Sequence, residues 1–376
     1  MTAPTEETRT PDLLYSQTEE DLRAAVRSLL ADRCDAPTVL ARVESGTPYD
    51  PQLWEALVVG IGAAGLLVPE ELGGQGAGHR EAAVVLEELG RSVAPTPYLT
   101  SAVVATETLL ALGAPDGPVA ELLGDLAAGR KAAVLALSFS APEPGAAQPA
   151  GVVAGELEGT VTGVADASAA DVLLVPTTDG LYAVETVTEG VTVAPLVPLD
   201  LTRPLATVTL AKAAGTRLAD GASAVSAVRR GLLAGAGLLA SEQLGIAEWC
   251  LTEAVRHTRE RHQFNRPVGS FQALKHRMAH IWLEVVSARA AARNAADALA
   301  AGSPDTPLAV AVAQAYCSKV AVHAAEECIQ LHGGIGMTWE HPAHLYLKRA
   351  KADSIAYGTA GHHHEVIAEL AELPAP

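Results

Sequence analysis

The sequence predicts a mainly α-helical protein with a central β-domain. Apolar residues make up 49% and charged residues 19% of the 376 residues, so the chain can bury a large core. One hydrophobic core rarely extends beyond about 250–300 residues, which favours more than one domain. Segments with the apolar spacing of helices occupy both ends of the chain, and short runs rich in Val, Leu and Thr occupy the middle. We therefore expect three domains, at residues 1–130, 131–220 and 221–376.

The first domain is predicted to be helical. Ala82, Val85, Leu86 and Leu89 recur at helical spacing, and acidic residues lie elsewhere around the same segment. Similar patterns continue through much of the domain. The expected helices span residues 19–32, 51–64, 79–90 and 97–112.

The middle domain is predicted to be a small antiparallel β-barrel. Its apolar runs recur about every 10 residues and are separated by Gly, Pro and Asp, which is typical of strands joined by turns. Helices of about 10–15 residues are not expected between these runs, which argues against a doubly wound dinucleotide-binding domain. The expected strands are residues 132–138, 159–164, 171–175, 181–187 and 206–210.

The last domain is predicted to be a four-helix bundle. Residues 222–259 contain no proline, and a continuous helix of that length would be about 55 Å long. Another helix is expected at residues 272–301. A third should begin at Thr306, as N-cap before Pro307, and end before Gly333. A shorter one should follow Ala360. Long helices with short connections are typical of antiparallel bundles, which often hold cofactors between their helices.

Charge and cysteine content exclude several classes of protein. The 26 basic and 44 acidic residues give a net charge of −18, which disfavours a nucleic-acid binder. The N-terminal residues 1–12 lack the apolar segment of a signal peptide, and the apolar runs are interrupted before the roughly 20 residues that span a bilayer. The four cysteines form no CxxC pair, as expected of reduced thiols. We expect a cytoplasmic protein without a membrane span.

Two stretches near the C-terminus contain the most informative residues. The first, RERHQFNRPVGSFQALKHRMA, spans residues 259–279. Its Arg261 lies near a helix C-terminus, where the dipole favours a cation. That guanidinium is suited either to bidentate binding of a phosphate or to simple solvation at a basic helix end.

The second stretch, QLHGGIGMTWEHPAHLYLKRAKADSI, spans residues 330–355. Its glycines allow the backbone to approach a ligand closely. His332, His341 and His344 raise the possibility of a metal, but no established ligand spacing follows. We therefore expect no metal site here.

These two stretches resemble the C-terminal half of the acyl-CoA dehydrogenase family. The motifs VPEELGG at residues 68–74 and EELG at residues 87–90 are also similar to that family, as is the order of the three domains. In sequence, the two stretches most resemble actinobacterial members of the family that act on bulky or sterol side-chain acyl-CoAs. Those members are often heteromeric. The resemblance implies FAD-dependent α,β-desaturation of an acyl-CoA thioester. It also implies a homo- or hetero-oligomer, dimer or tetramer, and an electron-transfer flavoprotein as electron acceptor.

The resemblance further implies which residues bind FAD. Arg261 corresponds to the arginine that reaches the pyrophosphate of FAD on a neighbouring subunit. Phe264 corresponds to a phenylalanine beside the cofactor, and Gln272 to a polar contact at its adenosine end. The remaining cofactor-binding positions implied are Gln330, Gly333 and Gly334, in the loop at the subunit interface, and Thr359.

The catalytic position departs from the family pattern. Tyr357 stands where the usual catalytic glutamate precedes Gly-Thr, and a phenol with a pKa near 10 is a poor base at neutral pH. Its backbone N–H remains a possible donor to the thioester oxygen. Some family members supply the base from the long helix, where Glu242 lies among apolar residues. Glu242 is therefore a candidate base, and the alternative is a structural carboxylate bound to an arginine or a backbone group.

The flavin cradle departs as well. Pro142 replaces the threonine of the family's Thr-Glu-Pro segment and offers neither a hydroxyl nor an N–H. The following strands lack the tryptophan that usually covers the flavin. These departures lead to an alternative function, a catalytically impaired partner subunit that completes the FAD site of another chain. A third hypothesis is a protein of the same fold that catalyses a reaction other than dehydrogenation, with Tyr357 or a histidine in its pocket.

Overall fold

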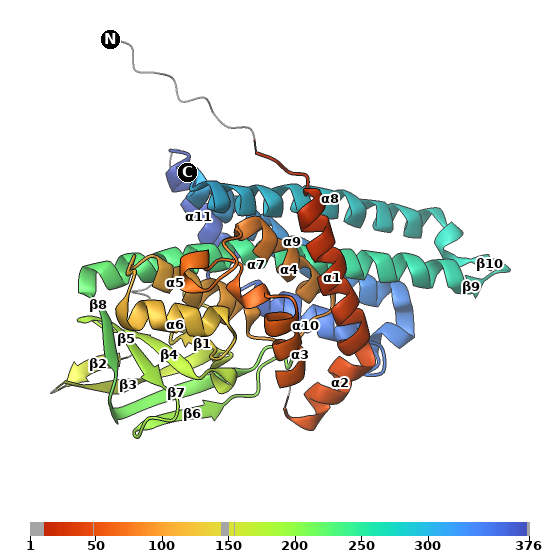
Figure 1. Cartoon of the computed structure of the whole chain (residues 1–376). Helices are drawn as coiled ribbons and strands as arrows, with labels where there is room; N and C mark the ends of the chain where they lie inside the picture. Colours follow the sequence, from red (N-terminus) through yellow and green to blue (C-terminus); the bar gives the residue numbers. More distant parts are fainter. Residues whose placement is uncertain (1–10, 48, 144–149, 154, 374–376) are drawn as a thin grey trace, which may run out of the picture.

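The structure, a computed structural model, describes residues 11–47, 49–143, 150–153 and 155–373. N-terminal helices pack between a β-domain and a bundle of long helices (Figure 1). This arrangement confirms the predicted fold class, mainly helical with a β-domain in the middle. The domain boundaries after residues 130 and 220 remain a prediction, although the first strand and the longest helix each begin close to one of them.

Short helices form the N-terminal region, and side-chain caps fix where several of them begin. Ser16 and Glu19 form a capping box at the first helix, and Asp35 and Asp50 cap the next two. Two expected helices are split, because π-helical turns replace parts of them at Ala56–Gly60 and Tyr98–Ala105. The helices are α1 (Gln17–Arg33), α2 (Ala36–Ser45), α3 (Pro51–Glu55), α4 (His79–Arg91), α5 (Thr106–Leu110) and α6 (Gly117–Ala127).

The β-domain consists of two four-stranded sheets. The first sheet has the order β1 (Ala133–Leu135), β4 (Val172–Pro176), β5 (Gly180–Glu185) and β8 (Thr216–Asp220). The second has the order β2 (Ala150–Val153), β3 (Glu156–Ala165), β7 (Leu205–Ala213) and β6 (Val191–Pro195).

Both sheets contribute to one apolar core. Leu173 and Val184 from the first sheet belong to the same buried cluster as Val161 and Val208 from the second. Pairing is antiparallel as expected except between β1 and β4, which run parallel. Parallel pairing is possible there because a long stretch of chain, including β2 and β3, separates the two strands.

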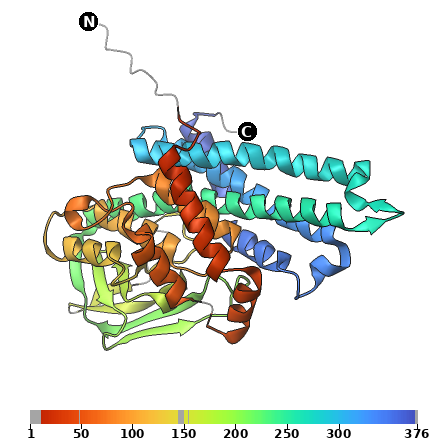
Figure 2. The same cartoon turned by 45° about the vertical axis from the view of Figure 1, so that its right-hand side comes forward.

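Long helices form the C-terminal bundle and run side by side in both views (Figures 1 and 2). The longest begins where Asp220 caps it and has 40 residues, or about 60 Å. The third helix begins at Thr306, and its N-cap residue is Asp305, one residue before the expected cap Thr306. The helices are α7 (Gly221–Glu260), α8 (Gln272–Ala301), α9 (Thr306–His332), α10 (Ala343–Asp353) and α11 (Ala360–Leu370). A hairpin, β9 (His262–Gln263) and β10 (Arg266–Pro267), extends beyond the bundle between α7 and α8 (Figure 1).

Two glycines allow α4 and α7 to cross in contact. A Cβ atom at Gly90 would lie 2.1 Å from the carbonyl oxygen of Glu242, and one at Gly245 would lie 1.9 Å from that of Glu87. Any side chain at either position would push the helices apart. The crossing fixes α7 at Glu242, which the sequence singled out as a candidate base.

Helix α9 is long and apolar enough to cross a membrane by composition alone. The segment Thr306–Met337 has a window of mean hydropathy 1.3, but 67% of that window is buried inside the protein. The helix packs against α7, α8 and α11. Its apolar composition is therefore accounted for by its place in the centre of the bundle.

Candidate functional site

The predicted catalytic position is closed by contacts within the chain. Tyr357 lies between α10 and α11 in a left-handed conformation, with φ of 52°. Its backbone N–H donates a hydrogen bond of 2.9 Å to the carbonyl oxygen of Phe139. The two rings meet edge to face, with centroids 5.2 Å apart. From the sequence, this N–H was expected to be available to donate to a thioester oxygen. In the structure it donates to Phe139.

Little space remains in front of Tyr357. The cavity there offers about 20 Å³ to the centres of water molecules, which is room for one or two waters. Burial raises the pKa of the Tyr357 phenol well above its usual value, so the hydroxyl stays neutral. The cavity is lined by Thr100, Val104, Leu135, Leu137, Ser138, Phe139, Ala165, Leu232 and Tyr357.

The residues around Tyr357 tighten this closure. His363 on α11 donates from Nε2 to the carbonyl oxygen of Tyr357 at 3.1 Å, and burial lowers the pKa of His363 to about 4. Gly358 has a φ of 105°, and a Cβ there would lie 3.2 Å from Pro142. Thr359, predicted beside a cofactor, instead caps α11, and its hydroxyl accepts from the N–H of His362.

Glu242 is bound by two arginines in the interior. Arg203 contacts both carboxylate oxygens at 2.9 and 2.7 Å, and Arg349 contacts one of them at 2.6 Å. Only 1% of Glu242 is exposed. Burial alone would raise its pKa, but the two guanidinium groups reverse this effect and hold the pKa below its usual value. This geometry favours the alternative of a structural carboxylate bound to arginines over a role for Glu242 as base.

The arginines join Glu242 to a wider buried network. Arg203 also binds Asp353 at 2.7 Å, and Arg349 also binds Asp200. Burial and the nearby Glu242 raise the pKa of Asp353, whose second oxygen has no hydrogen-bond partner among the described residues. The network ties the chain before β7 to α7 and α10, and its side chains are buried.

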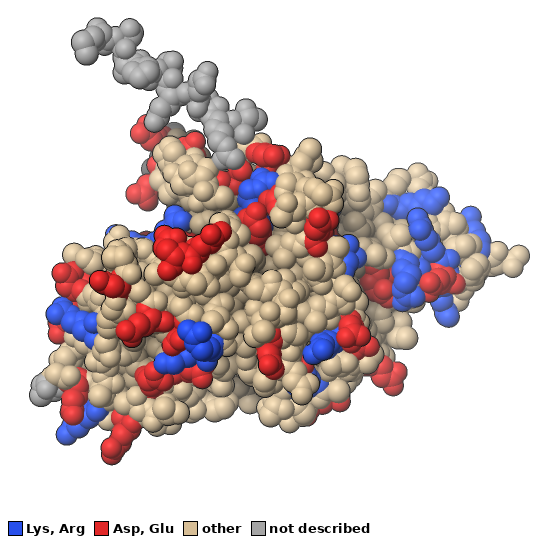
Figure 3. Space-filling view, in the orientation of Figure 1, with Lys and Arg blue, Asp and Glu red and all other residues tan. Residues whose placement is uncertain are grey.

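The end of the bundle is basic in an otherwise acidic protein. Lys and Arg side chains gather around the hairpin, at the right of Figure 3. The side chain of Arg261 has no hydrogen bond or ion pair to any residue that the structure describes. Phe264, in a left-handed turn at the hairpin tip, is 87% exposed. The exposed cations of this segment are Arg256, Arg259, Arg261, Arg266 and Lys275.

A groove of about 420 Å³ lies beside the hairpin. Arg259, Lys275 and Ser270 are among its lining residues, and the Ser270 hydroxyl is buried with no hydrogen-bond partner in the described chain. Two cations and an unpaired hydroxyl suit an anionic ligand such as a phosphate.

The glycine turn lies at the same end of the bundle. Gly333 and Gly334 follow α9 directly and are exposed, and Gly333 has a φ of 62°. The rings of His257, near the end of α7, and His332, just before the turn, lie 4.2 Å apart. The structure thus brings Gln330 and both glycines to the end that also carries the segment from Arg261 through Gln272.

Comparison with known proteins finds relatives along most of the chain. Residues 225–371 match the model "Acyl-CoA dehydrogenase, C-terminal domain" and residues 16–129 match "Acyl-CoA dehydrogenase, N-terminal domain". Acyl-CoA dehydrogenase IpdE2 of Mycobacterium tuberculosis is 37% identical over 88% of this chain and 89% of its own length. The chain belongs to the acyl-CoA dehydrogenase family.

Solved structures with this fold include heteromeric complexes. A chain of the ChsE4-ChsE5 complex from Mycobacterium tuberculosis has a TM-score of 0.85 and 28% identity, covering 97% of this chain and 100% of its own. A chain of the Tcur3481-Tcur3483 steroid acyl-CoA dehydrogenase has a TM-score of 0.83 and 27% identity, covering 95% and 98%.

In this acyl-CoA dehydrogenase family member, the residues at the end of the bundle are suited to bind FAD, and those near Tyr357 are not. At the bundle end, the unpaired Arg261 guanidinium and the exposed Phe264 ring suit the pyrophosphate and an aromatic part of a dinucleotide. Near Tyr357 the cavity is too small for a flavin ring, and Pro142 offers neither hydroxyl nor N–H. One chain therefore supplies suitable residues for only half of an FAD site.

Sequence reasoning missed the residues that close and stabilise this family member's own site. Phe139 lies three residues before Pro142 and was not identified as a site residue, and neither were Arg203 and Asp200. Their partners lie far along the chain, as Arg203 and Asp353 do across 150 residues. The only local signal was the closeness of Asp200 and Arg203 in the sequence.

Proposed function

We propose that this chain is a subunit of an FAD-dependent acyl-CoA dehydrogenase that forms an α,β double bond in an acyl-CoA thioester. Within that enzyme it completes the FAD site of a second, catalytic chain and does not turn over substrate at Tyr357. The closure at Tyr357 carries this proposal, because the N–H is bonded to Phe139 and the cavity has space for only one or two waters.

The chemistry of the reaction explains why this closure matters. Removal of a thioester α-proton needs a base, and hydrogen bonds to the thioester oxygen stabilise the developing enolate. FAD, when bound, supplies the acceptor for the hydride from the β-carbon. At its own site this chain offers a neutral phenol in place of a carboxylate, and its backbone donor is already used.

The opposite end of the molecule supports the second half of the proposal. Arg261 is unpaired within the described chain, and Phe264 extends into solvent with 87% of its surface exposed. Apolar side chains beside the glycine turn are also uncovered, with Met337 83% exposed. Large exposed apolar groups beside cations are typical of an interaction surface.

The relatives suggest the class of substrate and partner. The ChsE4-ChsE5 and Tcur3481-Tcur3483 structures are complexes of two proteins, and the second is described as a steroid acyl-CoA dehydrogenase. By that similarity the partner is a second acyl-CoA dehydrogenase chain with a catalytic glutamate, and the substrate is a bulky acyl-CoA. We further propose a cytoplasmic location and an electron-transfer flavoprotein as acceptor.

Co-expression tests this function. The chain is purified alone and together with a family member encoded nearby that has the catalytic glutamate, and flavin content and desaturation of a steroid side-chain acyl-CoA are measured. We expect little flavin and no turnover for the chain alone, and one FAD per pair of chains with turnover for the complex. A yellow, active homomer would overturn the proposal in favour of an independent dehydrogenase.

A further inference from the structure

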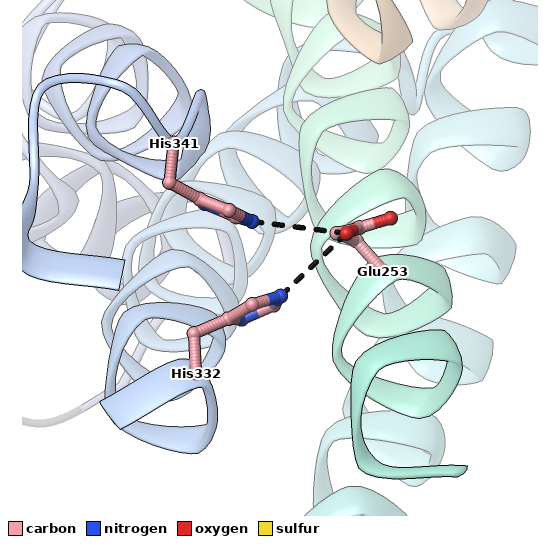
Figure 4. A group of neighbouring side chains, drawn as sticks. All are labelled: Glu253, His332 and His341. Carbon is pink, nitrogen blue, oxygen red and sulfur yellow. Dashed lines mark ion pairs between the residues drawn. The ribbon is translucent and has the colours of Figure 1, made fainter. Parts of the chain in front are cut away.

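A cluster of potential metal ligands lies beside the glycine turn (Figure 4). Glu253 on α7, His332 at the end of α9 and His341 just before α10 direct their side chains toward one point. The Nε2 atoms of His332 and His341 lie 3.6 and 3.7 Å from Oε1 of Glu253. One ligand atom from each residue lies within 4.8 Å of the others.

His332 has the orientation of a metal-binding histidine. Its Nδ1 lies 2.6 Å from the carbonyl oxygen of Cys328, and a carbonyl only accepts, so we assign the proton to Nδ1. A neutral ring then presents a lone pair on Nε2. That atom is buried, only 5% of the residue is exposed, and Nε2 has no hydrogen-bond partner among the described residues. A backbone carbonyl on the far nitrogen is the usual support for a histidine that binds metal.

The alternative is an ion pair between protonated histidines and Glu253, with no metal bound. Arg256 already binds both oxygens of Glu253, through Nη2 at 2.5 Å and Nε at 2.9 Å. The ring of His257 lies 4.2 Å from that of His332, and the ring of His341 also lies 4.2 Å from it. A metal at Oε1 of Glu253 would take the place of Nη2 of Arg256, which keeps its contact with Glu260 through Nη1.

We propose that Glu253, His332 and His341 bind one divalent transition-metal ion of the Zn²⁺ type. Two imidazoles and a carboxylate suit Zn²⁺ and its neighbours, whereas Ca²⁺ and Mg²⁺ prefer oxygen ligands alone. Water or His257 completes the coordination. Ligand bonds of about 2.0–2.2 Å require the side chains to close by about an ångström. His341 then gives up the 3.3 Å hydrogen bond that its Nδ1 accepts from Ala343.

The ion would have a structural role. It would link the C-terminal part of α7 to both sides of the turn that contains Gly333 and Gly334. The turn is otherwise exposed. A metal link would therefore fix the glycine turn relative to α7, independently of whether FAD is bound there.

Cobalt titration of the untagged, metal-free chain tests this site. Co²⁺ reports ligand type and geometry through its visible absorption, and metal analysis after dialysis against Zn²⁺ gives the stoichiometry. The half-buried His362 and the exposed His364 are a competing site. All measurements therefore use a parent that carries His362→Ala and His364→Ala. We expect one equivalent of metal in that parent.

Ligand variants in the same parent decide the assignment. His341→Ala and Glu253→Gln should each weaken Co²⁺ binding at least about 100-fold, because each removes one of three ligands. His344→Ala, three residues after His341 at the start of α10, is the matched control, since its Nε2 already contacts the carbonyl oxygen of Trp339. It should change affinity less than about twofold. A parent that binds no metal, or ligand variants that bind as tightly as the parent, would overturn the proposal.

Discussion

The backbone N–H of Tyr357 donates its hydrogen bond to the carbonyl oxygen of Phe139, 2.9 Å away. By the resemblance to the family, Tyr357 is at the expected catalytic position, and Phe139 lies three residues before Pro142, in the segment expected beside the flavin. In this chain they bind each other. The edge-to-face contact of their rings adds to the hydrogen bond and keeps the site closed.

Replacing the phenol tests whether Tyr357 takes part in chemistry. Tyr357→Phe should leave kcat of the assembled complex within about twofold, because a neutral buried phenol is not a base. Steady-state desaturation by the complex is the measurement. Tyr357→Glu in the chain alone should remain inactive, since the N–H is still bonded to Phe139. A large fall in kcat for Tyr357→Phe would show that the phenol acts in catalysis.

Removing the charge of Glu242 should mainly affect stability. Glu242→Gln leaves Arg203 and Arg349 without their shared carboxylate, and breaking a buried pair costs about 3–5 kcal/mol. Denaturant unfolding gives the change in free energy. Glu248→Gln, on the same helix, is the control because Glu248 pairs with the partly exposed Arg289, and it should cost less than about 1 kcal/mol. Equal losses for both variants would contradict the network.

His363 should make the protein less stable in acid. Burial lowers its pKa in the folded protein to about 4, compared with about 6.5 when unfolded, so the unfolded chain binds the proton first as pH falls. The stability that neutral His363 contributes is complete above pH 6.5 and is lost as pH falls toward 4. The loss should be roughly 2 kcal/mol relative to His363→Gln.

Unfolding free energies at several pH values measure this loss. His362 and His364 flank the ring and Tyr357 accepts its hydrogen bond, so each profile is compared with that of His364→Gln, which changes an exposed neighbour. Parallel profiles for the parent and His363→Gln would show that His363 does not titrate as proposed.

A methyl group at the helix crossing should separate α4 from α7. A Cβ at Gly245 would lie 1.9 Å from the backbone oxygen of Glu87, which cannot rotate away. Gly245→Ala should therefore cost about 1–3 kcal/mol or more. Gly60→Ala is the control, because a Cβ at Gly60 meets no atom within 4 Å. Equal thermal stability of the two variants would contradict the close crossing.

The helices and most strands could be predicted because their signals are local. Residues 272–301 form α8 as expected, since a long apolar period ends at Gly302. α2, α6 and α10, of 10 or 11 residues, were not among the expected helices, although the equally short α11 was. Such short periods are easily read as loops. Parallel pairing of β1 with β4 depends on tertiary packing and has no local signature.

The candidate site was predictable only in its linear motifs. The segment from Arg261 to Gln272 and the turn at Gly333 stand in the sequence as recognisable stretches, and the structure places both at one end of the bundle. The contacts of Glu242 could not be derived, because its partners Arg203 and Arg349 lie 39 and 107 residues away. Both a base and a structural carboxylate fitted the local sequence, and only the fold separates them.

The most direct test of the shared flavin site is the FAD content of the complex with Arg261→Ala. Arg229→Ala serves as control, since Arg229 is an exposed arginine near the start of α7, the helix that ends just before Arg261. We expect Arg261→Ala to lower bound FAD per complex at least about tenfold while the two chains still associate, and Arg229→Ala to retain full FAD. Full FAD retention by Arg261→Ala would show that Arg261 does not bind the flavin dinucleotide in the complex.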